Sequence, residues 1–478
     1  MSAGGGRPAP AASAALTYAD ALAALEARGR YGIRLGLGRV RALLRELDHP
    51  ETTVRGALVA GTNGKGSVIA LAGAALRAAG YRVGETPKPH LVTYRERIVV
   101  DGLPIEPAVF ARLVEEVLPI ADRVARQLGP PTEFELLTAV MFRHFAGEGL
   151  DVALVEVGLG GRLDATNAWD GGVAVLTNVG LDHVDRLGPT IDAIAREKVA
   201  IVKRGDIAVT GAQGGALAIV RRRCARLGVP LAVAEPVPVL AVTRDGLLVR
   251  MPSLGEVGLG LRGRHQAANV AVADALLDAL GAAGLATVGA DARRAGYAAA
   301  RWPGRLELVR DASGRDVLLD GAHNEDGAAA LAVALDDLRP FLSGEGPASG
   351  DGAGDSSGDG SGDDPGGPRL TIVWASMADK DIAAVVRAVA ASPWVAGADV
   401  ICTGVGLPRS LPPDELAAAW RAVLPTSRIR TAPDPGAALD LALRDGRGPV
   451  VVAGSLYLVG AARARLVDNP ALRDPVAA

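Results

Sequence analysis

Short runs of β-branched and aliphatic residues alternate along this chain with Ala- and Leu-rich stretches of helical length. Strands are predicted at 57–60, 152–157, 173–177, 316–319, 370–375, 399–402 and 449–453. Helices are predicted at 67–79, 107–127, 133–147, 190–203, 266–280, 324–341, 380–391 and 412–424. Strands that alternate with helices of this length form βαβ units, which build a mostly parallel, doubly wound sheet. The sequence therefore predicts an α/β protein.

The 478 residues suggest two or three domains, at about 150 residues each. Because 49% of the residues are hydrophobic and only 3% are aromatic, the cores must be built from Ala, Val and Leu. We expect a first domain over 17–301 and a smaller one over 302–478. The boundary falls in Arg301-Trp302-Pro303-Gly304-Arg305, which ends a helical stretch and precedes a new strand–helix series.

Two segments lack the apolar side chains that a core needs. Residues 1–16 are rich in Ala, Gly and Pro without a compact apolar stretch, so we expect a disordered leader and not a signal peptide. Residues 343–368 consist of Gly, Ser, Asp, Pro, Glu and Ala. Such a segment cannot bury enough surface to offset its ordering entropy, which predicts a disordered acidic insert in the second domain.

Charge and cysteine content exclude several classes of partner. The 51 basic and 54 acidic residues give a net charge of −3, which argues against nucleic-acid binding. No uncharged apolar stretch approaches the roughly 18–20 residues of a membrane span. The two cysteines, Cys224 and Cys402, lie far apart outside any C-x-x-C pattern, so we expect a reducing, cytoplasmic location. We expect a monomer, because no large apolar stripe requires a partner.

A glycine-rich turn follows the first predicted strand and opens a helix. Its residues are Gly61, Thr62, Asn63, Gly64, Lys65, Gly66 and Ser67. A helix N-terminus after such a turn directs backbone N–H groups at one spot and favours an anion there. Lys65 adds a positive charge, and the hydroxyl of Ser67 is a candidate magnesium ligand. Val59 and Gly66 break the strict phosphate-loop pattern, so a glycine-rich turn without a ligand stays an alternative.

Polar side chains follow two further predicted strands. Glu156 ends the strand at 152–157, and His183 follows the strand at 173–177. In open α/β sheets ligands bind beyond the carboxyl ends of the strands, where a carboxylate facing a phosphate loop is placed to bind Mg²⁺. A solvated carboxylate and a hydrogen-bonded histidine are the alternatives. Lys198, in the helix predicted at 190–203, would ordinarily lie on the surface.

A fourth polar cluster lies across the proposed domain boundary. Arg305 is followed by Asp320, Gly321, Ala322, His323 and Asn324 after the strand at 316–319. By itself this cluster reads as a turn in which Asp320 or Asn324 caps the next helix.

Taken in order, these motifs resemble the Mur ligase superfamily, and most closely the folylpolyglutamate synthase/dihydrofolate synthase family. The resemblance spans nearly the whole chain, and its most specific stretch runs from Glu156 to Asn167. The other matching segments are 32–37, 61–67, 89–98, 132–135, 181–183, 197–198, 265–269, 302–305, 320–324, 379–381 and 454–457.

The resemblance implies an N-terminal domain of the Mur ligase phosphate-loop type and a smaller Rossmann-like C-terminal domain, with the active site between them. It implies an ATP-dependent ligase that adds L-glutamate to a pterin or folate carboxylate through an acyl phosphate. The substrates would be ATP, L-glutamate and dihydropteroate or a reduced folate, and the matches at the pterin positions favour both acceptors.

The resemblance also assigns roles to residues of this chain. Catalysis would involve Lys65, Glu156, His183 and Lys198, with Glu156 and His183 as magnesium ligands and Lys198 carbamylated. ATP would contact Gly61, Thr62, Asn63, Gly64, Lys65, Gly66, Ser67, Asn269, Arg305, Asp320 and His323. The pterin substrate would contact Gly32, Ile33, Arg34, Leu35, Thr132, Glu133, Phe134, Glu135, Leu163, Asp164 and Ala165.

One position departs from the family pattern. The family usually has a serine just before the Pro-His-Leu turn, as a third magnesium ligand, and this chain has Lys88 there. An ammonium group has no lone pair and cannot ligate a cation. Either Ser67, water or a backbone carbonyl replaces that ligand, or Lys88 contacts phosphate directly.

Three other functions remain open at this point. A Mur-type ligase acting on a UDP-sugar peptide would share the superfamily, but its loop typically reads GKTT where this chain has Gly64-Lys65-Gly66-Ser67. A nucleotide hydrolase or binding module would leave His183, Lys198 and the second-domain cluster without a role. An inactive relative is the third, and Lys88 favours it slightly.

Overall fold

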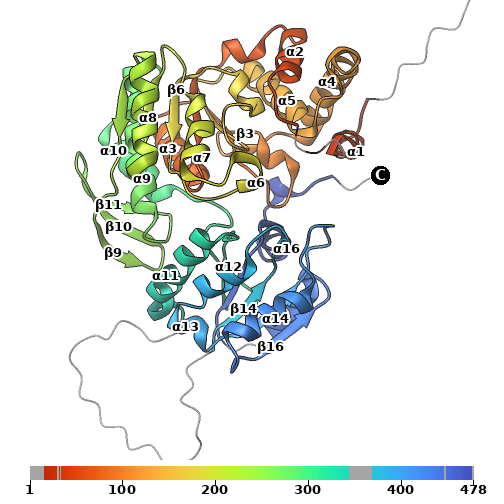
Figure 1. The fold of residues 1–478 in the computed structure, drawn as a ribbon, viewed down its shortest axis with the longest axis vertical. Helices are drawn as coiled ribbons and strands as arrows, with labels where there is room; N and C mark the ends of the chain where they lie inside the picture. Colours follow the sequence, from red (N-terminus) through yellow and green to blue (C-terminus); the bar gives the residue numbers. More distant parts are fainter. Residues whose placement is uncertain (1–14, 30–31, 33, 344–368, 446–447, 476–478) are drawn as a thin grey trace, which may run out of the picture.

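The computed structural model describes residues 15–29, 32, 34–343, 369–445 and 448–475. The predictions for 1–14 and 344–368, and the position of Ile33, lie outside the described residues. The described chain contains an eight-stranded, a three-stranded and a six-stranded sheet. Figure 1 shows two α/β parts stacked along the long axis, with the last helix, α16 (Leu456–Leu466), lying where the two parts meet.

The eight-stranded sheet is mostly parallel, as the alternation of strands and helices predicts. Its strands, in spatial order, are β4 (Leu103–Pro104), β3 (Val99–Val100), β2 (Val83–Thr86), β5 (Val152–Glu156), β1 (Gly56–Ala60), β6 (Gly172–Leu176), β7 (Ile207–Thr210) and β8 (Leu231–Val233). The six strands from β2 to β8 run parallel, whereas β3 and β4 pair antiparallel at the edge. Strands β5 and β1 are buried along their whole length, which explains their nearly continuous apolar sequences.

Helices cover both faces of this sheet. Alternate strand residues such as Leu58 and Val155 pack with α1 (Tyr18–Gly29), α2 (Gly38–Glu46), α4 (Pro107–Leu128), α5 (Glu133–Glu148) and α8 (Gly214–Leu227). The intervening residues, such as Val59 and Leu154, pack with α3 (Lys65–Ala78), α9 (Gln266–Ala282) and α10 (Ala290–Ala299). Two-residue alternation along buried strands is what places neighbours on opposite faces.

The small antiparallel sheet is an element that the sequence prediction missed. Its strands β9 (Val239–Thr243), β10 (Gly246–Met251) and β11 (Gly255–Leu259) pack their apolar side chains into the same core as α9 and α10. The helix predicted over 190–203 is also shorter than expected: α7 covers Ile191–Lys198, and a 3₁₀ turn follows at Val199–Ile201.

The second part repeats the layered design on a smaller scale. Its sheet runs β12 (Glu307–Arg310), β13 (Asp316–Leu319), β17 (Val450–Ala453), β14 (Thr371–Trp374), β15 (Asp399–Thr403) and β16 (Ile429–Ala432), and all pairs but β12–β13 are parallel. One face carries α11 (Glu325–Leu342), α12 (Ile382–Val389), α13 (Pro393–Ala396) and α14 (Pro413–Val423). The other face carries α15 (Pro435–Asp445) and α16.

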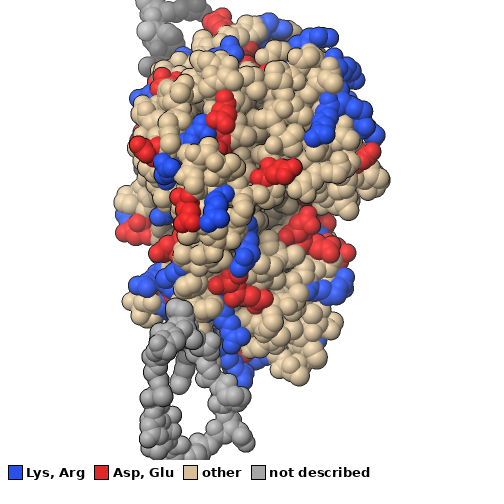
Figure 2. All heavy atoms as spheres, turned by 90° about the vertical axis from the view of Figure 1, so that its left-hand side faces the viewer, with Lys and Arg blue, Asp and Glu red and all other residues tan. Residues whose placement is uncertain are grey.

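The segment between α10 and β12 connects the two parts. Trp302 packs against the core of the first part, and Leu306 is buried in the core of the second. Among the described residues, no helix combines the length and the apolar character needed to cross a bilayer. On the face shown in Figure 2, basic and acidic side chains are interspersed.

Helices α3 and α10 pack closely at Gly296, and this contact can be tested by substitution. A Cβ atom at Gly296 of α10 would lie 2.3 Å from the Cα of Ala75 in α3. We predict that Gly296→Ala lowers the free energy of unfolding by about 1–3 kcal/mol, because a backbone atom cannot move aside like a side chain. The measurement is urea unfolding monitored by circular dichroism.

The matched control is Gly281→Ala in α9, where the nearest atom to a new Cβ is 3.5 Å away. That variant should be neutral or up to about 1 kcal/mol more stable, because Ala favours helix over Gly. Equal effects of the two substitutions would contradict the proposed close contact.

Candidate active site between the two α/β parts

The glycine-rich turn lies between β1 and the first turn of α3. Gly64, with φ of 81°, precedes the helix, and Lys65 is its first residue. The Lys65 ammonium donates to the carbonyls of Gly61 and Thr62, each at 3.0 Å. The turn therefore combines a helix N-terminus with a held positive charge, which is the arrangement that favours a bound phosphate.

Residues from three other segments enclose this turn. Thr177, after β6, donates its hydroxyl to the Asn63 carbonyl at 2.6 Å, and Asn178 accepts the Asn63 N–H at 2.9 Å. A Cβ at Gly64 would lie 2.3 Å from Oδ1 of Asn269 in α9, and one at Gly66 would lie 2.1 Å from the Trp302 ring. The glycines are therefore required because neighbouring side chains approach the backbone.

Ser67 and Thr62 also have partners within the site. The buried Ser67 hydroxyl accepts from Nε2 of Gln266 at 3.3 Å, and Gln266 in turn accepts from Asn269 at 2.8 Å. The Thr62 hydroxyl donates to the Gly180 carbonyl at 3.1 Å and accepts the Gly180 N–H at 2.9 Å. These bonds fix the turn against the β6 loop and the start of α9.

Lys198 is buried beneath the turn, not on the surface. Its ammonium donates to the Gly61 carbonyl at 2.9 Å, the same oxygen that accepts from Lys65. Burial, together with the positive charge of Lys65, lowers the pKa of Lys198 to about 7. A substantial fraction of this side chain is therefore a neutral amine near pH 7.

Glu156 ends β5 directly beside β1, paired in register with Val59. Its N–H donates to the Thr86 hydroxyl at 2.8 Å, and Oε2 accepts the N–H of Lys88 at 3.1 Å. Burial raises the pKa of the Glu156 carboxyl, and the positive charges of Lys65, Lys88 and Arg305 oppose that rise. Glu156 therefore lies among cations from three separate segments.

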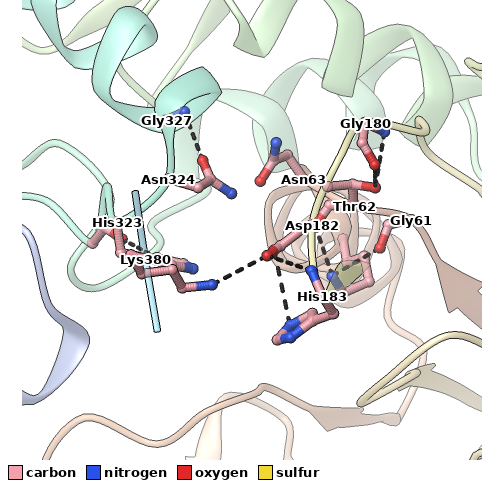
Figure 3. Close-up of polar contacts among 12 residues, drawn as sticks. Gly61, Thr62, Asn63, Gly180, Asp182, His183, His323, Asn324, Gly327 and Lys380 are labelled. Carbon is pink, nitrogen blue, oxygen red and sulfur yellow. Dashed lines mark hydrogen bonds and ion pairs between the residues drawn. The ribbon is translucent and has the colours of Figure 1, made fainter. Parts of the chain in front are cut away.

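His183 and Asp182 follow β6 and face the second part of the molecule (Figure 3). Asp182 accepts the His183 N–H at 2.9 Å and pairs with the Lys380 ammonium at 3.1 Å. Shielding from water lowers the pKa of the His183 imidazole, although 46% of its side chain stays exposed. A neutral imidazole keeps the lone pair that a metal ligand needs.

The second part contributes Arg305, Asp320 and His323. Both carboxylate oxygens of the buried Asp320 accept backbone N–H groups, from Leu306 and Ala322, each at 2.8 Å. His323 Nδ1 lies 2.7 Å from the Gly321 carbonyl. The positive charge of Arg305 acts on both Asp320 and Glu156. Asp320 therefore shapes the turn that carries His323, while Arg305 faces both parts.

Two of the predicted pterin-contacting residues form a capping box at the start of α5. The Thr132 hydroxyl and the Glu135 carboxylate cap each other's backbone N–H groups, and Arg39 donates to Glu135 at 3.0 Å. Their side chains are buried in this network. This finding gives Thr132 and Glu135 a structural explanation, and direct substrate contact by them stays a prediction.

Among the other residues predicted to contact the pterin, Leu163 and Asp164 have defined partners in the loop after β5. Gly36 follows three residues that are predicted to contact the pterin, Gly32, Arg34 and Leu35. The N–H of Gly36 donates to the Leu163 carbonyl at 3.4 Å. Asp164 accepts the Leu159 N–H at 2.8 Å and caps the 3₁₀ turn that begins at Ala165, itself part of the core. Glu133 acts on the Tyr94 hydroxyl, whose pKa is raised by burial and by that carboxylate.

A magnesium ion fits the donors present, but the described side chains supply few of its ligands. Within the described residues, no group of three or more His, Cys, Asp or Glu side chains is positioned to hold a metal. Glu156 offers a carboxylate beside the phosphate turn, and Mg²⁺ typically takes one or two carboxylates plus phosphate oxygens and water. The donor set therefore fits an ion that is completed by a nucleotide.

Sequence reasoning missed Asp182 and Lys380 as a pair. Lys380 precedes α12, and Asp182 lies 198 positions earlier in the loop after β6. Both belong to segments that matched the family, so the resemblance offered a signal, but their contact depends on how the two parts face each other.

The comparisons with known proteins agree with this geometry. The model of the Mur ligase middle domain matches residues 59–233. Dihydrofolate synthase/folylpolyglutamate synthase of Bacillus subtilis is 37% identical over 328 residues, 66% of this chain and 76% of the relative. The protein of the same name from Mycobacterium tuberculosis is 34% identical over 477 residues, 91% of this chain and 90% of the relative.

Solved structures show the same likeness. Mycobacterium tuberculosis folylpolyglutamate synthase complexed with ADP and AMPPCP has a TM-score of 0.80 at 32% identity, covering 95% of this chain and 100% of that one. A bifunctional folylpolyglutamate synthase/dihydrofolate synthase with Mn, AMPPNP and L-glutamate bound has a TM-score of 0.72 at 28% identity, covering 94% and 98%.

The fold, the phosphate turn and these relatives define an ATP-dependent ligase built on a Mur ligase middle domain. Within that class, the chain belongs to the folylpolyglutamate synthase/dihydrofolate synthase family.

Proposed function

We propose that this enzyme uses ATP to join L-glutamate to the carboxylate of dihydropteroate and of a reduced folate. The observation that carries the proposal is the convergence of Lys65, Glu156 and Arg305, from three segments, around the turn after β1. The relatives named as dihydrofolate synthase/folylpolyglutamate synthase support both acceptors.

The chemistry requires positive charge more than a nucleophilic side chain. A carboxylate oxygen of the acceptor attacks the γ-phosphorus of ATP, the bond to the bridging oxygen breaks, and ADP leaves. The amine of glutamate then attacks the acyl carbon, phosphate leaves with the bonding electrons, and the nitrogen loses a proton. Because both reactants of the first step are anions, Lys65 and Arg305 would lower their repulsion and stabilise the transferring group.

Magnesium would be held by Glu156 and His183, together with phosphate oxygens. When bound, the ion supplies charge neutralisation at the γ-phosphate. The other predicted nucleotide contacts, from Gly61, Thr62, Asn63, Gly64, Gly66, Ser67, Asn269, Asp320 and His323, are proposed on their positions around the turn. The pterin contacts are proposed on the family resemblance, at Gly32, Ile33, Arg34, Leu35, Thr132, Glu133, Phe134, Glu135, Leu163, Asp164 and Ala165.

Two rival functions are less well supported. A hydrolase that turns over ATP without an acceptor would not need Gly36 to contact Leu163, or Phe134 and Asp164 to meet at Gly158, two residues after Glu156. A ligase for UDP-sugar peptides is disfavoured by the dihydrofolate synthase/folylpolyglutamate synthase relatives.

We also infer the setting in which the enzyme works. Division into domains 17–301 and 302–478 is supported by the separate cores on either side of Trp302. Cys224 and Cys402 are both buried and unpaired, which supports a reducing cytoplasm. We expect a monomer that acts on small molecules, without nucleic acid or membrane; on the face shown in Figure 2, basic and acidic side chains are interspersed.

Turnover tests the proposed reaction. With ATP, Mg²⁺, L-glutamate and either dihydropteroate or tetrahydrofolate, ADP release should depend on glutamate and on the acceptor. ATP turnover that is indifferent to both would contradict the ligase and support a hydrolase. Glu156→Gln should lower kcat by about 10²-fold or more, because it removes the carboxylate charge at the metal.

The Glu156 variant has a matched control in Glu148→Gln. Glu148 ends α5 and pairs with Arg82 at the surface, so its loss should leave kcat within twofold. Wild-type turnover in the Glu156 variant would refute the metal assignment while leaving the reaction itself intact.

Carbamylation of Lys198 is the last part of the proposal. A neutral amine adds to CO₂ and loses a proton, which yields a carbamate anion. Since the pKa of Lys198 is about 7, the reaction should be favoured as pH rises through 7 and lost as pH falls. We expect ¹³CO₂ to give a carbamate carbon signal in wild-type NMR spectra at pH 8, absent in Lys198→Arg. The same signal in both proteins would contradict the assignment.

A further inference from the structure

Lys88 stands where the family pattern has a metal-binding serine, and its surroundings give it a different role. It follows β2, which pairs with β5, so its side chain lies beside the end of the strand that carries Glu156. Its backbone N–H donates to Oε2 of Glu156 at 3.1 Å, and its ammonium donates to the Glu156 backbone carbonyl at 2.6 Å. Lys88 is therefore anchored to Glu156 at both ends.

The Lys88 ammonium also contacts a residue that is predicted to bind the pterin. Nζ lies 4.4 Å above the centroid of the Phe134 ring, at the first turn of α5. The Phe134 ring and Oδ2 of Asp164 both lie within 3.1 Å of where a Cβ of Gly158 would stand. The charge of Asp164 acts on Lys88, and so does the charge of Lys65 from the phosphate turn. Lys88 thus lies between the two sets of residues that the reaction must bring together.

The donors of this ammonium leave room for a substrate oxygen. A lysine ammonium has three N–H donors and no acceptor. One donor is taken by the Glu156 carbonyl, and the Phe134 ring attracts the charge through its face without taking a directed N–H···O bond. Asp164 accepts hydrogen bonds from Leu159 and Thr166, and within the described residues it accepts none from the Lys88 ammonium. At least one N–H therefore remains for an anionic oxygen.

We infer that Lys88 binds the reacting carboxylate of the pterin or folate acceptor and holds it toward the phosphate turn. This inference rests on the proposed function, and it replaces a metal ligand by a fixed cation. We favour the acceptor carboxylate over the nucleotide phosphate as the ligand of Lys88, because Nζ contacts Phe134, which is predicted to bind the pterin. The phosphate turn already has its own ammonium group, that of Lys65.

Such a contact would act on binding and on chemistry together. An ammonium held between two anions lowers their mutual repulsion, and its attachment to Glu156 keeps the carboxylate at a constant distance from the metal ligand. Removing the charge should therefore weaken acceptor binding and lower kcat, with little effect on nucleotide affinity.

The test compares an acceptor acid with its amide. Dihydropteroate, and the analogue in which its carboxylate is a carboxamide, are titrated by calorimetry against protein saturated with AMPPCP and Mg²⁺. Wild-type enzyme should bind the acid at least about tenfold more tightly than the amide, since a charged hydrogen bond is lost with the amide. In Lys88→Met that preference should fall to about threefold or less, because the methionine keeps the stem but not the charge.

Two further variants separate charge from folding. Lys88→Gln keeps a donor for the Glu156 carbonyl without the charge and should behave like the methionine variant. Lys88→Arg keeps the charge and should retain most of the preference. Lys203→Met is the matched control: that lysine also donates to backbone carbonyls, of Trp169 and Ile201, at the opposite end of the strands.

Several outcomes would overturn the inference. An unchanged preference for the acid in Lys88→Met and Lys88→Gln would show that Lys88 does not contact the carboxylate. A large loss of AMPPCP affinity with the preference intact would assign Lys88 to the phosphate. If wild-type enzyme failed to release ADP with any acceptor, the proposed function itself would be wrong. If wild-type enzyme is active and the Lys88 variants bind the acid as wild type does, only the inference about Lys88 is wrong.

Discussion

The site depends on the pairing of β1 with a parallel strand on each side. The register between β1 and β5 sets Val59 opposite Glu156, and the register between β1 and β6 sets Ala60 opposite Leu176. The turn after β1, the carboxylate at the end of β5 and the loop after β6 must therefore leave the sheet at one edge. Because these strands are apolar and buried on both faces, a shift of register would expose core side chains, and the arrangement is strongly specified.

Positive charge is concentrated at that edge and held by backbone oxygens. Lys65 and Lys198 share the Gly61 carbonyl, and Lys88 donates to the carbonyl of Glu156. Ammonium groups so close together repel one another, which lowers the pKa of Lys198 beyond the effect of burial. A pocket of this kind favours anions, and its donors are in place before the substrates arrive, which is how preorganised sites stabilise a transferring phosphoryl group. The pair of Lys380 with Asp182 extends the charged network to the second part.

Sequence patterns predicted the central strands and most of the helices between them, but they missed short antiparallel hairpins. The central strands and the helices between them are recognisable because each is a continuous apolar or periodic run. Several β-hairpins were missed, and two of them contain an Asp-Gly dipeptide, a typical turn signal, at Asp101-Gly102 and Asp245-Gly246. At Asp101-Gly102 both residues have positive φ, as a type I′ turn requires.

The parts of the candidate site that are formed by a local motif could be predicted from the sequence. The contacts between residues far apart in the chain could not. Thr132 and Glu135 carry the Thr-x-x-Glu signature of a capping box, which the resemblance to pterin-contacting positions obscured. The contacts of Lys88 with Phe134, and of Lys380 with Asp182, depend on side-chain directions across long separations, so no spacing reveals them.

The most direct measurement is a crystal structure with Mn²⁺ and AMPPNP, in which anomalous scattering locates the metal. We predict a manganese peak bonded to a carboxylate oxygen of Glu156 and to phosphate oxygens that the Lys65 ammonium and the N-terminus of α3 also contact. A manganese peak remote from Glu156, or a triphosphate bound away from residues 61–67, would contradict it.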